Sequence, residues 1–124
     1  MEYLRRHQGG LGQIRLAINL DGVGFIGHPT GLSFYECPQD FQQAALSALG
    51  SYPGLQEMQP WFQGDHMIFV INGVPAMALT TTGFMQMETE IAHTSKDSLD
   101  KIDVSLLVEA AHFIRDLIQS ISEI

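Results

Sequence analysis

Six side chains could bind a metal or act as acids and bases, and they fall into three groups along the chain. One aspartate follows an apolar run, an Asp-His pair lies near the middle, and a third group follows a second apolar run. Carboxylates and neutral imidazoles are ligands that suit zinc, and they also transfer protons. The six residues are Asp21, Asp65, His66, Glu90, His93 and Asp97.

Each group also has an explanation that involves no chemistry. Asp21 precedes a glycine, and Asp-Gly at the end of a strand commonly forms a turn. The Asp65-His66 pair can cap a helix, and His93-Thr94 can form local hydrogen bonds in a loop. The spacing matches no compact zinc signature such as HExxH or paired CxxC. The residues alone therefore predict an α/β domain with carboxylates and imidazoles at loop ends.

The elements that would position these groups alternate between strands and helices. Residues 13–20 have apolar side chains at every second position, which predicts a strand ending at Asp21. Residues 38–49 predict a helix with proline in its first turn and glycine beyond its end. Strands are also expected at 32–36 and 75–80. The short apolar run 67–71 fits either a helix or a strand.

The clearest predicted element is a long C-terminal helix. Asp103 is placed to cap it. Residues 51–64, 81–100 and the turns around Gly24 are expected to be loops, and residues 2–8 a short helix. Strands and helices in alternation favour an α/β layered fold, with a mixed sheet flanked by helices. The apolar residues at helical spacing are Leu107, Ala110, Ala111, Ile114, Leu117, Ile118 and Ile121.

Composition restricts the class of protein. The chain has 124 residues, 45% hydrophobic and 16% charged, which predicts one packed domain spanning residues 1–124. A net charge of −8 argues against nucleic acid and anionic membranes as partners. No apolar run reaches the ~20 residues of a membrane helix, and the N-terminus lacks the apolar core of a secretory signal. A cytoplasmic location is predicted.

The single cysteine, Cys37, excludes an internal disulfide and favours a reducing compartment. Cys37 precedes a proline, and no base is identifiable near it in the sequence. These features favour a small buried or capping residue over a nucleophile.

Three blocks in order resemble the C-terminal half of the dinuclear zinc exopeptidases. The blocks are IRLAINLDGVG (14–24), GDHMIFVINGVPAMAL (64–79) and IAHTSKDSLDKID (91–103). They resemble a strand ending in a metal-binding Asp, an Asp-His followed by a Gly-(Ile/Val)-Pro-Ala strand, and a His-Thr-x-x-Asp before the last helix. The family includes bacterial leucyl aminopeptidase, aminopeptidase Y, glutamate carboxypeptidase and the glutaminyl-peptide cyclotransferases.

The resemblance implies two zinc ions, a peptide substrate and a role for each matching residue. Asp21 would be a ligand of one zinc ion and His93 of the other. Four residues would lie behind these ligands and orient groups near the metals: Asp65, His66, Thr94 and Asp97. Three apolar residues would line the substrate pocket: Phe84, Met85 and Met87.

The chain departs from the family pattern because the first half of the domain is missing. That half carries the first His, the Asp that bridges both metals and a Glu-Glu pair, one member of which is the general base. No Glu-Glu pair occurs in the 124 residues. With only Asp21 and His93 present, tight zinc binding is not expected. The resemblance therefore implies a fragment of a larger catalytic domain that is inactive alone and that forms homo-oligomers through an exposed sheet edge.

Three alternatives remain open at this point. The chain could be a binding module for a peptide or protein that has kept the fold without the chemistry. It could be a half-enzyme completed by a second chain that supplies the Glu-Glu pair and the bridging Asp. The resemblance could also be accidental. Aminopeptidase, carboxypeptidase and cyclotransferase chemistry all remain possible for the parent domain.

Overall fold

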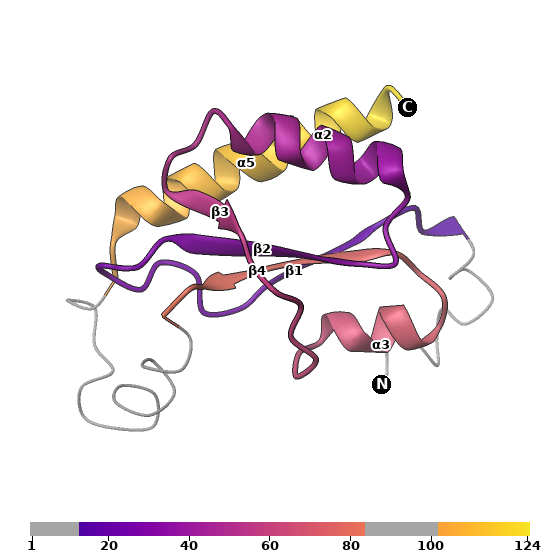
Figure 1. Ribbon diagram of the computed structural model, residues 1–124, viewed down its shortest axis with the longest axis horizontal. Coiled ribbons are helices and arrows are strands. Elements are labelled where there is room, and N and C mark those ends of the chain that lie inside the picture. Colours follow the sequence, from indigo (N-terminus) through magenta and orange to yellow (C-terminus); the bar gives the residue numbers. More distant parts are fainter. Residues whose placement is uncertain (1–12, 84–101) are drawn as a thin grey trace.

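The computed structural model describes residues 13–83 and 102–124. These residues form a four-stranded sheet between two helical layers, with α2 and α5 on one face and α3 on the other (Figure 1). The predicted α/β class, with a mixed sheet and a long C-terminal helix, is confirmed. The elements are β1 (Ala17–Leu20), β2 (Thr30–Tyr35), α2 (Gln39–Leu49), β3 (Leu55–Glu57), α3 (His66–Ile71), β4 (Ala76–Thr81) and α5 (Val104–Ser122).

The sheet has the strand order β1-β4-β2-β3. Strand β1 pairs with β4 in parallel, from Ala17 beside Ala76 to Leu20 beside Leu79. Strand β2 pairs antiparallel with β4 and parallel with β3. The carboxyl ends of β1 and β4 and the start of β2 therefore meet at one end of the sheet.

Strand β4 is covered by helices on both faces of the sheet. All six of its residues are buried, as expected for a central strand with helices on either side. Met77 and Leu79 join the core beneath α2 and α5, whereas Ala76 and Ala78 face α3. The small alanine side chains leave room for the short helix to approach the sheet closely.

The boundaries of several predicted elements need correction. The expected loop at 51–64 contains β3, whose three residues are too few for a periodic signal. The strand predicted at 13–20 begins only at Ala17, and the strand predicted at 32–36 is β2 at Thr30–Tyr35. The ambiguous run at 67–71 is helical, because α3 begins at His66.

Helix α5 begins where predicted, and Ala110, Leu117 and Ile121 are buried as predicted. Of the expected inward residues, Leu107, Ala111 and Ile118 are exposed. The exposed residues lie beside the buried stripe and are also apolar, so periodicity alone does not separate the two groups. The buried stripe is Leu106, Ala110, Phe113, Leu117 and Ile121.

None of the helices within residues 13–83 and 102–124 is long and apolar enough to cross a membrane.

The cap of α5 predicts an acid-sensitive contribution to stability. Asp103 Oδ1 accepts hydrogen bonds from the Ser105 hydroxyl at 2.6 Å and the Ser105 backbone N–H at 3.0 Å. The hydroxyl bond is the main reason that the pKa of Asp103 lies below its ordinary value. A lowered folded-state pKa means that this stabilisation is present above the unfolded-state pKa and is lost as pH falls below about 4.

Asp103→Asn tests this contribution, because asparagine keeps a cap acceptor but does not titrate in this range. Urea midpoints at pH 7 and pH 3 should differ less in the variant than in the wild-type chain. The pKa of Asp116 is also lowered, chiefly by the Tyr52 hydroxyl, so both proteins should retain some acid sensitivity. Equal acid losses in the two proteins would contradict a role for the Asp103 carboxylate.

Candidate functional site

Asp21 lies at the end of the sheet where β1 and β4 finish together. Its backbone N–H donates to the Leu79 carbonyl at 3.0 Å, and the residue itself is exposed. After β4, the Thr82 backbone N–H donates to the Pro29 carbonyl at 2.9 Å, just before β2 begins. Carboxyl ends of parallel strands are the usual place for binding groups in an α/β sheet. The predicted position of Asp21 at a strand end is confirmed.

The turn after Asp21 returns the chain beneath the start of α5. Phe25 forms a β-bridge with Ile102, and the Asp103 backbone N–H donates to the Gly24 carbonyl at 2.8 Å. Gly24 has φ +99°, and a Cβ placed there would lie 2.9 Å from Leu107 Cδ2. The positive φ favours glycine at this position, and the short contact would also displace the Leu107 side chain. Gly83 and Ile102, which flank the undescribed residues 84–101, belong to segments held at this same end of the sheet.

His66 lies on the α3 side of the sheet and is only 1% exposed. The Asn19 amide Nδ2 lies 3.1 Å from His66 Nδ1, and the Trp61 carbonyl oxygen lies 3.0 Å from Nε2. Because an amide nitrogen donates, Nδ1 accepts and Nε2 carries the proton. Both ring nitrogens are thus engaged within the protein, and His66 presents neither of them to a metal.

The His66 bonds belong to a larger buried network that holds the segment before α3 against the sheet. The Tyr35 hydroxyl donates to the Trp61 carbonyl at 2.6 Å and accepts from the Trp61 backbone N–H at 2.7 Å. The Ser33 hydroxyl donates to the Tyr35 oxygen at 3.0 Å. The rings of Tyr35 and Trp61 each lie with their centroids 4.5 Å from that of His66. A buried hydrogen-bond network of this kind favours a single arrangement of loop and sheet.

Sequence reasoning missed Asn19, Tyr35 and Trp61 as partners of the Asp-His pair. A polar residue inside the apolar alternation of β1 was the available signal for Asn19. Asp65 is the N-terminal flanking residue of α3 and is exposed, but its carboxylate forms no capping hydrogen bond. The pair therefore lies at a loop-to-helix junction, but the explanation that it caps the helix through its carboxylate is wrong. The His66 imidazole instead forms hydrogen bonds with Asn19 and Trp61.

The family model for peptidase family M28 matches residues 2–118. The match covers most of the chain, including β1, the Asp-His pair and most of α5. The chain belongs to peptidase family M28. It therefore has a metallopeptidase origin, as the three sequence blocks predicted. A comparison with curated proteins found no match.

Within this M28 chain, the described residues bring only part of the predicted site together. No group of three or more His, Cys, Asp or Glu side chains in residues 13–83 and 102–124 is arranged to hold a metal ion. Asp21 is at the sheet end, while Asp65 and His66 are at α3 on one face of the sheet. The other predicted site residues lie outside the described ranges: Phe84, Met85, Met87, Glu90, His93, Thr94 and Asp97.

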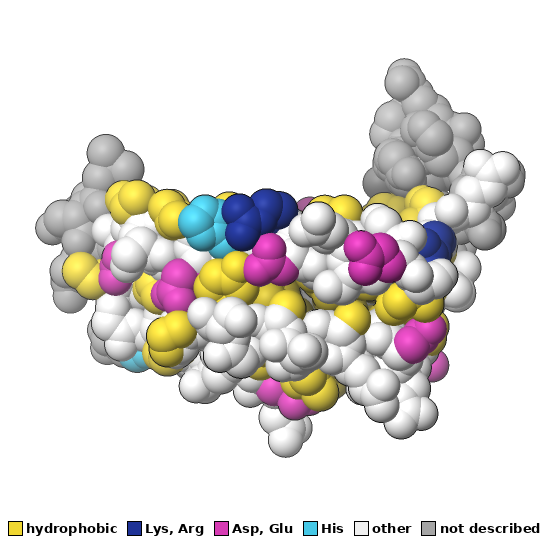
Figure 2. All heavy atoms as spheres, turned by 90° about the horizontal axis from the view of Figure 1, so that it is seen from above, with side chains coloured by type: hydrophobic (Ala, Val, Ile, Leu, Met, Phe, Trp, Pro, Cys, Tyr) yellow, Lys and Arg dark blue, Asp and Glu magenta, His cyan; other side chains and the backbone are white. Residues whose placement is uncertain are grey.

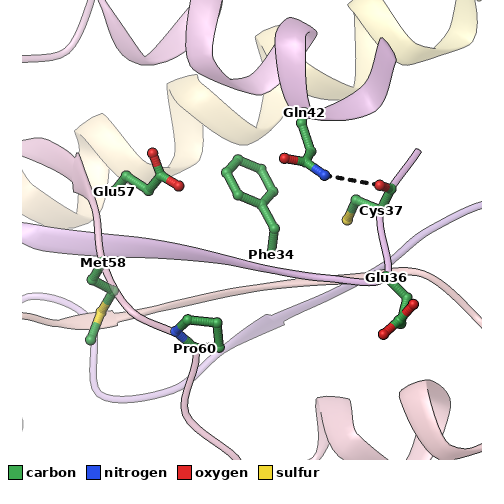
Figure 3. A pocket seen from close by; sticks show the side chains of 7 residues that line it. All are labelled: Phe34, Glu36, Cys37, Gln42, Glu57, Met58 and Pro60. Carbon is green, nitrogen blue, oxygen red and sulfur yellow. Dashed lines mark hydrogen bonds between the residues drawn. The ribbon is translucent and has the colours of Figure 1, made fainter. Parts of the chain in front are cut away.

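A pocket of about 410 Å³ opens between the start of α2 and the β3 side of the sheet (Figure 3). Cys37 lies at its wall, where Sγ donates to the Ala76 carbonyl at 3.1 Å. The Gln42 amide donates to the Cys37 carbonyl at 3.0 Å. Burial raises the pKa of the Cys37 thiol above its ordinary value, which disfavours the thiolate. The prediction that Cys37 is a packed residue fits this environment better than a nucleophilic role does.

Proposed function

We propose that this M28 chain supplies one ligand to each ion of a dinuclear zinc site, in an aminopeptidase-like peptidase. Asp21 would bind one ion and His93 the other. Asp65, Thr94 and Asp97 would orient groups around the metals, and Phe84, Met85 and Met87 would line the pocket for a peptide substrate. The position of Asp21 supports the first assignment, because an exposed carboxylate follows β1 at the shared carboxyl end of two parallel strands.

The described residues do not complete a zinc site by themselves. A catalytic zinc ion needs three protein ligands, with a further position open for water or substrate. Asp21 provides one carboxylate, and both nitrogens of His66 are bound to Asn19 and Trp61. We therefore infer that this chain does not hold zinc tightly when it is alone.

We further propose that the chain alone does not hydrolyse peptides. Zinc-bound water needs a nearby general base to accept its proton during attack on a carbonyl. In the family the base belongs to a Glu-Glu pair, and these 124 residues contain no such pair. Asp21 would bind zinc and so could not also serve as the general base.

Hydrolysis of leucine p-nitroanilide in buffer containing added zinc tests this proposal. We expect no rate above the buffer background for the wild-type chain, and the same background for His93→Ala. Asp40→Ala, a change of an exposed carboxylate on α2, is the matched control for altered charge. Turnover by the wild-type chain that Asp40→Ala retains and His93→Ala abolishes would overturn the proposed inactivity.

The remaining assignments stay predictions. A peptide substrate and a cytoplasmic location are expected from the family and from the sequence.

A further inference from the structure

Strand β2 loses its neighbour on the β3 side after Leu32. The Met58 backbone N–H donates to the Leu32 carbonyl at 2.8 Å. The next donor in a parallel ladder, to the Phe34 carbonyl, would be Pro60, which has no N–H. Thr30 and Leu32 bond toward β3, and backbone groups alternate between the two sides of a strand, so those of Phe34 also point this way. No backbone hydrogen bond within residues 13–83 and 102–124 fills this side of Phe34, so the edge of β2 is open there.

The chain leaves this edge because the residues after Pro60 are held on the other face of the sheet. The Trp61 backbone N–H donates to the Tyr35 hydroxyl at 2.7 Å, and the Trp61 carbonyl accepts from the same hydroxyl at 2.6 Å. Tyr35 belongs to the buried cluster on the α3 face. These bonds draw the chain away from the edge of β2, so β3 cannot continue alongside Phe34.

The open edge of β2 lies in a groove. The pocket of about 410 Å³ contains the partly exposed Phe34 ring at its centre (Figure 3). A second hollow of about 420 Å³ adjoins this pocket, and the two share Glu57, Met58 and Pro60 in their walls. Leu32 is level with Glu57, and Glu36 follows four residues later, about 13 Å along an extended chain. The groove therefore matches the length of about four extended residues.

Two carboxylates and no basic side chain line this groove. Glu36 and Glu57 are both exposed, and neither forms an ion pair within the part of the chain that the structure describes. The Gln42 amide nitrogen donates to the Cys37 carbonyl at 3.0 Å, so the same side chain also offers its Oε1 as an acceptor. Acidic side chains are spread over the surface seen from the helical side as well (Figure 2). A cationic occupant is therefore complementary to the groove.

We propose that this groove binds an extended, lysine- or arginine-containing segment of a partner protein, which adds to the edge of β2 at Phe34. One residue of the segment would exchange backbone hydrogen bonds with the N–H and carbonyl of Phe34. Its basic side chains would pack their apolar stems against Phe34 and Pro60 and place their charges beside Glu36 and Glu57. A second copy of this chain is a poor occupant, because each copy has a net charge of −8.

Fluorescence anisotropy of a labelled five-residue peptide of alternating lysine and valine, with blocked ends, measures binding to the full 124-residue chain. We expect a saturable rise in anisotropy at about 50 mM salt. Glu36→Gln combined with Glu57→Gln should raise the peptide Kd at least about fivefold, because both changes remove a charge and keep the size of the side chain. Glu123→Gln is the matched control, at the exposed end of α5 and outside the groove lining, and should change the Kd by less than about twofold.

Changes to the peptide separate strand addition from charge attraction. Methylation of every backbone nitrogen keeps the lysine charges but removes the donor to the Phe34 carbonyl, so the methylated peptide should bind at least about fivefold more weakly. Serine in place of each lysine keeps the backbone donors and removes the charges. This neutral peptide should also bind at least about fivefold more weakly.

Three results would overturn the proposal or part of it. A wild-type chain with no saturable binding up to about 1 mM peptide would overturn it entirely. Equal binding by the double glutamine variant would place the peptide outside the groove, and equal binding of the methylated peptide would overturn strand addition. The groove lies at the end of β2 away from Asp21, because Tyr35 pairs with Ala76 where β4 begins. Zinc content and hydrolysis therefore test the proposed function separately.

Discussion

Replacing Phe113 by alanine is expected to lower the free energy of unfolding by about 3–5 kcal/mol. Phe113 is 0% exposed and lies in the core cluster between α5, α2 and the sheet. Its ring also meets Tyr52 edge to face, with the centroids 6.4 Å apart. The substitution removes this contact and leaves a cavity that the rigid sheet beneath it cannot close. Because a domain of this size is stable by only about 5–15 kcal/mol, the variant should be close to unfolding.

Urea denaturation followed by circular dichroism measures this loss. Phe62→Ala is the control, because Phe62 is 68% exposed, although its ring also meets that of Tyr35 edge to face at a centroid distance of 6.0 Å. We expect this control to lose less than about 1 kcal/mol. A Phe113→Ala loss no larger than that of Phe62→Ala would show that α5 does not pack on the sheet as described.

His66→Leu is expected to cost about 2–4 kcal/mol of stability, although leucine fits an apolar site. The change removes the acceptor of the Asn19 amide and the donor to the Trp61 carbonyl. A buried polar group left without its partner costs about 1–3 kcal/mol. The Trp61 carbonyl retains its bond from the Tyr35 hydroxyl, so the Asn19 amide should carry most of the penalty.

A double-mutant cycle separates this penalty from lost packing. Asn19→Leu combined with His66→Leu removes both partners, so the double variant should lose less than the sum of the two single losses, by about 1 kcal/mol or more. His112→Leu is the control for removing an exposed imidazole and should change stability by less than about 0.5 kcal/mol. Additive losses at Asn19 and His66 would contradict the hydrogen bond between them.

Local signals in the sequence were sufficient for much of the fold. The cap at Asp103 and the apolar spacing after it predicted the start of α5, because both act within a few residues. Strand β3 carried no such signal, since three residues cannot display a period. The buried stripe of α5 was predicted only in part, because Leu107 and Ile118 are as apolar as the residues that face the core.

Less of the candidate site could be predicted from the sequence, because some of its contacts join residues that are far apart in the chain. Asp21 could be placed from sequence because the alternation of β1 ends directly before it. The role of His66 depends on Asn19, which is 47 positions away in the chain, and such a pairing exists only once the sheet and α3 have packed. His93 lies outside the described residues, so its assignment as a ligand stays a prediction.

The zinc content of the purified chain tests the central claim most directly. Elemental analysis after dialysis against zinc-containing and then zinc-free buffer should give far less than one zinc ion per chain. Asp21→Ala and the control Asp40→Ala should give the same low value, because one carboxylate cannot retain the ion. Stoichiometric zinc in the wild-type chain that Asp21→Ala removes and Asp40→Ala retains would contradict the account.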